Sequence, residues 1–472
     1  MSTDGKIAAG LFFVAAITFG YFTGGAGWNQ EAHFDLTRAV VERHTLYVDG
    51  YDVNTGDLSP GTGGHTYINK PPGASLLAAI PYAIVFAAEK RLHSPIDGMT
   101  RINCWISTAL SVGLCGACIG PVLYLYGRRR IGATARAALA VAAIVLFCTM
   151  VFPYSTMLFA QIPAALFLLL AVVLLPKHPL LAGMAAGIAV SCFYVCAAAA
   201  AILFVVACIR SRRAAARFAI GCLPWIALMA IYQWHSFGSP FKTAVEASTR
   251  FTENGALFGV LRMPSRAALY GLSASPYRGL FFASPVLLLA LIGLVVMARR
   301  HDLREDLWTV ITIVSLFFIA IASFNGWNGG CAFGPRYLVP IVPLLGIPLL
   351  AMIRIRSRPL LAFWIVSAFL SVSINFIATA TDAMPCPSIS DPIGSYLLPA
   401  FFTGRIPEET RMVIPWYPTR SVDKIALPRD SGNLGELIFG KRKRASLFPV
   451  LIWLVGGMTF LFRAASRTET PT

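Results

Sequence analysis

The stretch that decides the architecture is residues 24–73, GGAGWNQEAHFDLTRAVVERHTLYVDGYDVNTGDLSPGTGGHTYINKPPG, which lies between two apolar segments. It holds three cations and six carboxylates, and the carboxylates are Glu31, Asp35, Glu42, Asp49, Asp52 and Asp57. The stretch therefore carries a formal charge of −3 in a chain whose net charge is +17. Acidic side chains gathered in one polar loop favour chemistry or cation binding there. A loop that is charged only for solvation fits the composition equally well.

The composition predicts a polytopic, all-α membrane protein. Of the 472 residues, 57% are hydrophobic and only 13% are charged, and the mean hydropathy is +0.68, whereas soluble domains carry about 25% charged residues. Most of the Lys and Arg residues stand in short loops between apolar runs, as in cytoplasmic anchoring of membrane helices. We therefore expect a lipid bilayer as the partner of this basic chain and no nucleic acid.

Twelve apolar segments are long enough to be considered as membrane crossings, with 11–13 as the expected range of helices. They are 6–23, 74–89, 102–126, 134–152, 159–176, 179–209, 218–234, 280–298, 307–323, 338–353, 359–378 and 446–463. The first has no strongly basic stretch before it and no convincing cleavage site after it, so we expect a retained helix and not a signal peptide. Residues 1–463 are predicted to form one transmembrane domain, and 464–472 a cytoplasmic tail.

Twelve crossings place both termini in the cytoplasm and four loops outside, which are 24–73, 235–279, 324–337 and 379–445. The basic loops 210–217, 299–306 and 354–358 then lie inside, in accordance with the positive-inside rule. Arg128–Arg130 would lie outside, against that rule. A segment between 74 and 176 that does not cross fully would repair this, whereas splitting 179–209 alone would reverse every later loop. The topology of 100–210 stays open at this stage.

The ten cysteines lie mostly within apolar runs, where they are typical of small buried side chains. Cys115 and Cys118 form a CxxC, but within an apolar helix, which favours packing over metal binding. Cys331 and Cys386 fall in polar loops on the same predicted side of the membrane. A disulfide between them is open, because the spacing does not argue for it.

Three segments of the outer loops carry candidate chemistry. In 28–46, Glu31 and Asp35 stand four residues apart on one face of a predicted interfacial helix, with Arg38 as an alternative ion-pair partner. Segment 47–57 offers oxygen ligands in turns, so a divalent cation is open as a cofactor, although the spacing excludes an EF-hand. Lys70 precedes two prolines, which fix an extended conformation there; it suits a carrier phosphate or, alternatively, snorkels to the headgroups.

Segment 326–340, GWNGGCAFGPRYLVP, combines a glycine-rich turn with Arg336. The glycines allow a backbone to approach a ligand closely, and a guanidinium fixed by Pro335 can bind phosphate in bidentate fashion. Trp327 and Tyr337 alone would fit an ordinary aromatic belt at the membrane interface, but a belt does not explain the consecutive glycines.

Together these motifs resemble a known family. The series N-x-x-x-x-x-D-L-T-x-A-x-V-E, D-x-Y-x-x-N-T-G-D and G-H-x-Y-x-x-K-x-P-G, followed by G-W-N-G-G-x-x-x-G-P-R-Y-L-x-P, is similar to bacterial membrane glycosyltransferases of the GT-C superfamily. These resemble protein O-mannosyltransferases and the aminoarabinose transferase of lipid A. The resemblance covers about residues 28–400.

The resemblance implies transfer of a sugar from a polyprenyl-phosphate carrier, usually with inversion, to a glycan, lipid or protein acceptor. It also implies a bacterial inner membrane, with the site facing outside or the periplasm. A carboxylate in the first outer loop would be the general base. Relatives often carry an Asp-Glu pair after the first helix, where this chain has Asn29 and Gln30.

Because that pair is missing, the resemblance assigns the base to a later carboxylate, Asp35 first, then Asp57, with Glu31 as a third candidate. Lys70 matches the family lysine, although Asn69 replaces an aspartate that often precedes it. Substrate binding is assigned to Lys70, His65, Asp49, Arg336, Tyr337 and Trp327.

Two other classes of function remain open. One is a transporter or flippase of a lipid-linked or anionic solute, although no internal repeat is visible and the acids lie in a loop. The other is a non-catalytic scaffold for envelope assembly, which would tolerate the neutral Asn29 and Gln30. The sequence does not give the sugar, the acceptor, the carrier length, the metal dependence or the oligomeric state.

Overall fold

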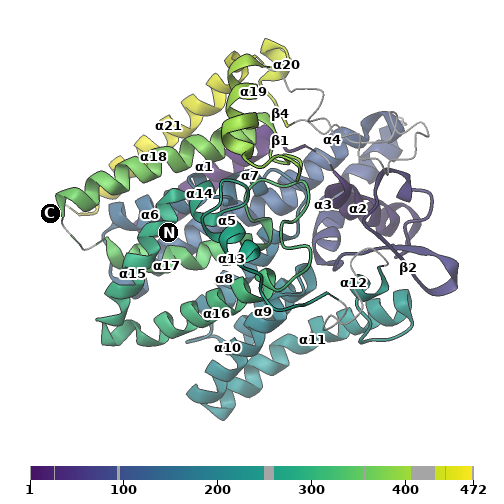
Figure 1. Ribbon diagram of the computed structural model, residues 1–472, viewed down its shortest axis with the longest axis horizontal. Helices are drawn as coiled ribbons and strands as arrows, with labels where there is room; N and C mark the ends of the chain where they lie inside the picture. The colour runs from purple at the N-terminus through teal and green to yellow at the C-terminus, as the bar shows by residue number, and fades with distance from the viewer. Residues whose placement is uncertain are drawn as a thin grey trace.

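The computed structural model describes residues 2–25, 27–92, 96–248, 260–353, 355, 357–404, 431–441 and 443–469, with only the backbone for 96–100. Helices dominate (Figure 1). In the first half they are α1 (Thr3–Tyr21), α2 (Trp28–Arg38), α3 (Gly73–Leu92), α4 (Ile96–Thr108), α5 (Leu114–Tyr126), α6 (Ala135–Phe147), α7 (Val151–Tyr154), α8 (Gln161–Leu174), α9 (Pro179–Cys192), α10 (Cys196–Arg210) and α11 (Arg212–Phe237). In the second half they are α12 (Ala244–Ala247), α13 (Arg266–Ser273), α14 (Leu280–Ala283), α15 (Leu288–Ala298), α16 (Arg304–Ala322), α17 (Val342–Met352), α18 (Arg358–Thr381), α19 (Leu398–Thr403), α20 (Glu436–Phe439) and α21 (Phe448–Arg467).

Four short strands form two antiparallel pairs. Strand β1 (Phe22–Thr23) pairs with β4 (Gly432–Asn433), which joins the end of the first helix to the segment before the last one. Strands β2 (Leu58–Pro60) and β3 (Thr66–Ile68) form a hairpin, with Leu58 opposite Ile68 and Pro60 opposite Thr66. The expected all-α class is therefore confirmed, with strands confined to short links between helices.

Seven helices within the described residues are long and apolar enough to cross a membrane, by length and composition. They are Thr3–Tyr21, Gly73–Leu92, Arg101–Ile131, Arg212–Phe237, His301–Ala322, Arg358–Thr381 and Arg444–Arg467. The apolar windows of the helices at 212–237 and 358–381 are only 17% buried within the protein, so large side chains such as Ile231 and Phe369 face outward. Exposed apolar surface of this extent requires lipid as its solvent. The chain is an integral membrane protein.

The centre of the helical bundle is α17, whose residues are all buried. Its neighbours approach it through glycines: a side chain at Gly293 would collide with the backbone of Pro348, and one at Gly346 would press against Leu123. Close approach through small residues is the usual way in which helices associate in lipid, where burial of apolar surface gives little driving force.

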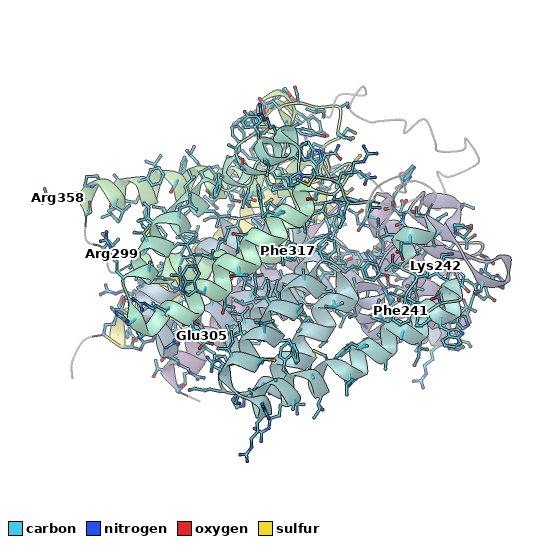
Figure 2. The ribbon with its side chains drawn as sticks, turned by 60° about the horizontal axis from the view of Figure 1, so that its bottom comes forward. Phe241, Lys242, Arg299, Glu305, Phe317 and Arg358 are labelled. Atoms are coloured by element: carbon cyan, nitrogen blue, oxygen red, sulfur yellow. The ribbon has the colours of Figure 1, made fainter. Side chains whose placement is uncertain are left out.

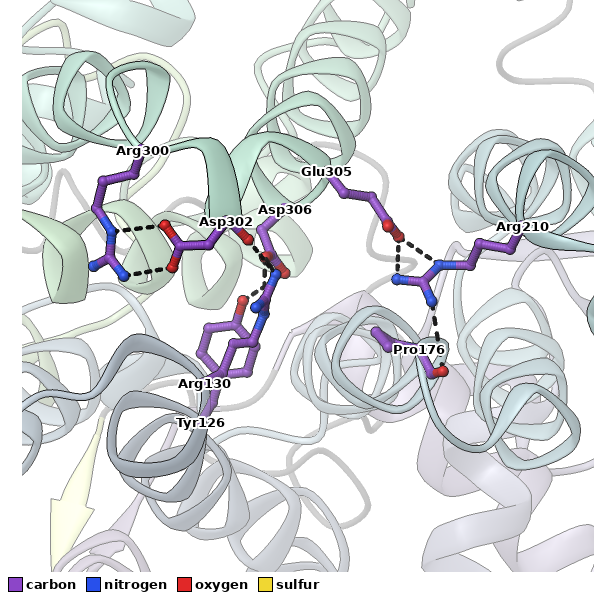
Figure 3. Close-up of polar contacts among 8 residues, drawn as sticks. All are labelled: Tyr126, Arg130, Pro176, Arg210, Arg300, Asp302, Glu305 and Asp306. Carbon is purple, nitrogen blue, oxygen red and sulfur yellow. Dashed lines mark hydrogen bonds and ion pairs between the residues drawn. The ribbon is translucent and has the colours of Figure 1, made fainter.

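One end of the bundle is a basic face held together by ion pairs. Arg128 pairs with Asp4 at 2.9 Å and Arg136 with Glu469 at 2.8 Å. Arg130 pairs with Asp306 at 2.6 Å, and Arg210 with Glu305 at 2.5 Å (Figure 3). These contacts bring both ends of the chain, Arg128–Arg130 and the 299–306 loop to one face. In the region 100–210, whose topology the sequence left open, Arg128–Arg130 therefore lie on the same face as the other basic loops and not on the opposite face.

Helix α3, predicted as the crossing 74–89, accounts for the conflict between the twelve-crossing count and the positive-inside rule at Arg128–Arg130. Gly73 packs against Ser191 at the end of α9 that lies away from the basic face. Trp105 donates a hydrogen bond to the carbonyl of Gly20, also at that end, so the helix beginning at Ile96 starts there too. Between Leu92 and Arg101 the chain can span at most roughly 21 Å, less than the roughly 30 Å of a bilayer core. Helix α3 therefore begins and ends toward the same face.

A second difference cancels the first. The segment 179–209, counted as one crossing, is two helices, α9 and α10, separated by extended backbone at Phe193. Each change alone would reverse every later loop, and together they leave the later loops where the sequence placed them. The described parts of 24–73, 235–279, 324–337 and 379–445 share one face, which we call the site face; Arg250, Arg354 and Arg442 lie outside the described residues.

Figure 2 shows the two ends of the bundle: Arg299, Glu305 and Arg358 mark the basic face, and Phe241 and Lys242 mark the site face. Helices α2 and α3 with the β2 hairpin form a cap on the site face (Figure 1). Helix α21 continues to Arg467 on the basic face, so the expected tail at 464–472 begins within a helix.

Substitution of Asp306 by asparagine is expected to lower the thermal stability of the protein in detergent. Its carboxylate accepts hydrogen bonds from Arg130 and from the Tyr126 hydroxyl and is only 11% exposed, so its loss should cost about 1–2 kcal/mol. The matched control is Asp302→Asn, because Asp302 pairs with Arg300 but is 53% exposed, and such pairs contribute little. Equal thermal midpoints for the two variants would contradict the assignment.

Candidate active site

The β2–β3 hairpin aligns two of the candidate residues. Its register continues one step beyond the strands, where the amide of Asn69 donates to the carbonyl of Asp57 at 2.9 Å. Lys70 follows directly, and Pro71 and Pro72 hold the extended backbone at that point. The motifs N-T-G-D and K-P-P are thus neighbours in space because they end the two arms of one hairpin.

Asp57 and Lys70 form a buried ion pair. Lys70 Nζ lies 3.2 Å from Asp57 Oδ2, with the two side chains 16% and 11% exposed respectively. Burial alone would raise the pKa of Asp57, but the charges of Lys70 and Arg336 outweigh it and hold that pKa below its usual value of 3.8. The carboxylate is therefore ionised at neutral pH, between a cation of the first loop and a cation of the 324–337 loop.

Arg336 is positioned by the glycine-rich turn. Gly329 has a φ of +76°, and a side chain at that position would lie 3.0 Å from Cγ and Nε of Arg336. The guanidinium lies 4.8 Å from the ring centre of Tyr337 and 5.5 Å from that of Phe159, and it donates to the Tyr337 hydroxyl at 2.9 Å. Its Nε is buried without a hydrogen-bond partner. A donor left unpaired in this way suits an anionic ligand.

Arg278 is a residue that the sequence analysis did not predict as part of the site. Its side chain is fully buried, and it donates to the carbonyls of Ala332, Gly330 (2.7 Å) and Pro385 (3.3 Å). It thereby joins the glycine-rich turn to the loop that follows α18. Its role is to hold the segment that carries Arg336.

His33 is a second residue that the sequence reasoning missed. It is 1% exposed, and its Nδ1 lies 2.9 Å from the Ser75 hydroxyl. Burial and the nearby charge of Lys70 lower the pKa of His33 to about 3, with the Asp57 charge acting in the opposite direction. The imidazole is therefore neutral beside the Asp57–Lys70 pair. Its position three residues after Gln30 on one helix face was the signal that could have found it.

The opposite face of α2 carries Glu31 and Asp35, both buried. Asn54 donates to Asp35 Oδ1 at 3.2 Å, and Asp35 Oδ2 is buried without a hydrogen-bond partner. Burial, followed by the charge of Glu31, raises the pKa of Asp35 well above its usual value. The alternative ion pair of Asp35 with Arg38 is not the one observed, because Arg38 pairs with Glu42 at 2.8 Å.

Glu42 is the centre of an anchoring network. Besides Arg38, it accepts hydrogen bonds from the hydroxyls of Tyr51 at 2.7 Å and Tyr82 at 2.5 Å. Because Tyr82 belongs to α3, this half-buried carboxylate joins α2, the following turn and α3 into one unit. A fully satisfied network of this kind fixes the geometry of the loop.

Of the other predicted binding residues, Tyr337 lies with the cluster, and Asp49, His65 and Trp327 make different contacts. Asp49 and His65 bind each other at 2.6 Å on the outer side of the hairpin, where both side chains are about 40% exposed, and His65 stacks on Tyr47. Trp327 packs against Gly271 and edge-on to Tyr277. Tyr337 touches Arg336 and stacks on Phe193. The structure thus brings together Asp57, Lys70, Arg336 and Tyr337, and it places Asp49, His65 and Trp327 in other contacts.

Solved structures similar to this chain were found, although no protein-family model and no curated protein matches its sequence. ArnT from Cupriavidus metallidurans bound to undecaprenyl phosphate aligns over 98% of this chain and 76% of ArnT, with a TM-score of 0.51 and 14% sequence identity. The apo form of the same protein aligns over 98% and 75%, with a TM-score of 0.50 and 14% identity. The chain has the GT-C fold. The resemblance to the aminoarabinose transferase is thereby confirmed at the level of the fold.

Within the GT-C fold of this chain, several buried polar atoms around α2 have no hydrogen-bond partner. They include Asn29 Oδ1, Gln30 Oε1, Asp35 Oδ2 and Asn69 Oδ1. Buried acceptors without partners mark places where water or a ligand binds. In the described part of the chain, no three side chains of the His, Cys, Asp or Glu type come together as a metal site.

Replacing Asp35 by asparagine is expected to remove a pH-dependent loss of stability. Because folding raises the pKa of Asp35, its favourable contribution is complete below pH 3.8 and is lost as the pH rises through the folded pKa, at up to about 1.4 kcal/mol per pH unit. Asparagine stays neutral, so the variant should be the more stable protein at pH 8. Thermal unfolding in detergent from pH 4 to 9 measures the difference.

Asp391→Asn is the matched control for Asp35→Asn, because Asp391 also lies in a loop of the site face and accepts a hydrogen bond from a backbone amide, that of Gly394. If the thermal stability of the wild type and that of Asp35→Asn changed with pH in the same way, the idea that Asp35 is buried without a cation to balance its charge would be contradicted. Asp57 should behave in the opposite sense, because its lowered pKa gives stability that is lost only as the pH falls below 3.8.

Proposed function

We propose that the chain is a glycosyltransferase that moves a sugar from a polyprenyl-phosphate carrier to a hydroxyl of a glycan, lipid or protein. The observation that carries the proposal is the buried Asp57–Lys70 ion pair with the Arg336 charge beside it. This cluster combines a base with two cations. Transfer of a sugar from a phosphate carrier requires both kinds of group, the base for the acceptor hydroxyl and the cations for the leaving phosphate. ArnT, which has the same fold, has been solved with undecaprenyl phosphate bound.

In this proposal Lys70 and Arg336 bind the carrier phosphate. Lys70 sits on a rigid extended segment, and Arg336 presents an unpaired Nε between two aromatic rings. As the bond between the sugar C1 and the phosphate oxygen breaks, negative charge develops on the leaving phosphate. Two cations already in place stabilise that charge without reorganisation.

Asp57 is the proposed general base. When Lys70 turns from Asp57 to the phosphate, the carboxylate loses its cation and gains an anionic neighbour, so its pKa rises from the depressed value of the free protein. It can then take the proton of the acceptor hydroxyl while the acceptor oxygen bonds to C1. One displacement of this kind inverts the configuration at C1, and the products are the glycosylated acceptor and the polyprenyl phosphate.

Asp35 stands second for this role, although the sequence reasoning had placed it first. Its raised pKa suits a base, but its known contacts are with Asn54 and Glu31 on the face of α2 away from His33. Asn54 and Asp57 belong to one turn, so Asp35 would act by positioning that turn. Asp49, His65 and Trp327 remain candidates for contacts with the acceptor or the sugar, because they belong to loops of the same site face.

The proposed orientation puts the basic face in the cytoplasm and the site face outside or in the periplasm of a bacterial inner membrane. The ion-paired Arg128, Arg130 and Arg210 at the basic face support it. The acceptor and carrier would then meet at the outer leaflet, where α2 and α3 cap the bundle.

The test is transfer by purified protein in liposomes that contain polyprenyl phosphates bearing radiolabelled sugars. Extraction and chromatography follow the label from the carrier to the acceptor. Loss of transfer in Asp57→Asn, with carrier binding retained, would support the proposal. Movement of labelled carrier between leaflets without any transfer would replace it with a flippase, and retained activity with every loop carboxylate substituted would remove the general base.

A further inference from the structure

Two loops of the site face are paired side by side next to Arg336. The amide of Ala332 donates to the carbonyl of Pro385 at 3.2 Å, and the amide of Phe333 donates to the carbonyl of Ala383 at 3.0 Å. Arg278 reinforces the pairing, because its guanidinium donates to carbonyls on both segments. The residues that precede Ala332 and follow Pro385 are therefore held close together.

Those two residues are Cys331 and Cys386. Their thiols are hydrogen-bonded to each other and are not joined by a disulfide bond in the structure. Cys386 is 8% exposed and Cys331 is half-buried, so Cys331 is the thiol that a reagent reaches first. The eight other cysteines lie on or directly beside the apolar helices from α4 to α11. This pair is thus the one carried by loops of the site face within the described residues.

We propose that Cys331 and Cys386 form a disulfide in the mature protein and thereby fasten the segment that carries Arg336 to the loop after α18. The proposal uses the orientation given above, in which the site face meets an oxidising compartment. It concerns a covalent link that the transfer reaction itself does not require.

The chemistry is thiol–disulfide exchange with an oxidised dithiol, either a small-molecule disulfide or a disulfide oxidoreductase. The Cys331 thiol loses its proton, and its sulfur attacks the oxidant's disulfide to give a mixed disulfide and one released thiol. The Cys386 sulfur then displaces the second sulfur of the oxidant. Two protons and two electrons pass to the oxidant, whose two sulfurs leave as thiols. The hydrogen bond between the two thiols, followed by burial, raises the pKa of Cys331, so we expect oxidation to be slow without a catalyst.

The link would act on the site through position. Cys331 stands five residues before Arg336, and Met384, two residues before Cys386, contacts Gln30 of α2 through its sulfur at 2.6 Å. A covalent bond there would tie α2, the glycine-rich turn and the loop after α18 into one unit. The expected consequence is a tighter hold on Arg336.

The experiment counts free thiols in protein trapped with acid from aerobically grown cells. The denatured protein is alkylated with and without prior reduction, and intact mass gives the number of alkyl groups. We expect two fewer groups on the unreduced sample, out of ten cysteines, and a peptide pair joining Cys331 to Cys386. Cys331→Ser and Cys386→Ser should each abolish the deficit, whereas the matched pair Cys115→Ser with Cys118→Ser should leave it unchanged.

Ten alkyl groups on the unreduced wild type would overturn the proposal. A deficit that survives Cys331→Ser would also overturn it, because the link would then lie elsewhere. The link must also show in stability: each single variant should lower the thermal midpoint of the oxidised protein equally, and the double variant should lower it no further. Because thiol counting does not depend on a donor or acceptor, its failure is separate from failure of the proposed transferase activity.

Discussion

Asp57→Asn is expected to lower the rate constant for sugar transfer by about 10²- to 10⁴-fold, the usual contribution of a general base. Asparagine keeps the shape of the side chain and can accept from Asn69, but it cannot take a proton. It also leaves Lys70 without its ion-pair partner at 3.2 Å, so that cation becomes free for the carrier phosphate. The KM for the donor should therefore stay the same or fall while kcat falls, which steady-state kinetics in liposomes would measure.

Asp52→Asn provides the control, because it removes a carboxylate from the same loop without touching the Asp57–Lys70 pair. A fall in kcat/KM that lies wholly in KM would contradict the role of Asp57 as base and leave it only a binding role. Unchanged activity in Asp57→Asn, together with a loss in Asp35→Asn, would return the base to α2.

Arg336→Lys is expected to raise the donor KM by about 30- to 150-fold, corresponding to the loss of a charge-assisted hydrogen bond of about 2–3 kcal/mol. Lysine keeps the charge but lacks the planar fork, and it cannot occupy the same position between the rings of Phe159 and Tyr337. The bond from Arg336 to the Tyr337 hydroxyl would also be lost. Titration of donor binding alone would separate this effect from chemistry.

The matched control for Arg336→Lys is Arg300→Lys, which makes the same exchange on the basic face, where Arg300 pairs with Asp302. It should leave KM unchanged. If Arg336→Lys lowered kcat with no change in donor affinity, Arg336 would act on the leaving phosphate only in the transition state, and the binding role would be wrong.

Hydropathy was sufficient to predict where the apolar helices lie, but not which of them cross the bundle or where one helix ends and the next begins. The run 74–89 is as apolar as a crossing helix, yet α3 begins and ends toward the site face, because its partners are α2 and α4 and not the far side of the bundle. The run 179–209 is continuous in hydropathy, and only three residues, with extended backbone at Phe193 and a turn at Tyr194 and Val195, separate the two helices. Only the basic triplet Arg128–Arg130, which lies between these two runs, indicated that the number of membrane crossings there disagrees with the positive-inside rule.

The sequence could predict those parts of the candidate site whose residues lie close together along the chain. Asp57 and Lys70 flank the paired ends of the two strands in one hairpin, so their short separation in the sequence is consistent with their contact in the structure. The strands themselves were not predicted. Arg336 joins them from nearly 270 residues further along the chain, and only the resemblance linked the two motifs. Arg278 and His33 gave little signal, because what distinguishes them is complete burial beside charges, which depends on distant partners.

The packing of the first helix against the last has a consequence for biogenesis. Tyr21 of α1 donates to the carbonyl of Ser446, Trp453 of α21 donates to the carbonyl of Val14, and Gly10 lies against Leu461. At about 5–20 residues per second, the ribosome needs roughly 20 to 90 seconds between making α1 and making α21. During that interval α1 has already entered the bilayer without its final neighbour. We therefore expect nascent chains truncated before α21 to be the species on which membrane insertases and quality-control proteases act, and only full-length chains to escape them.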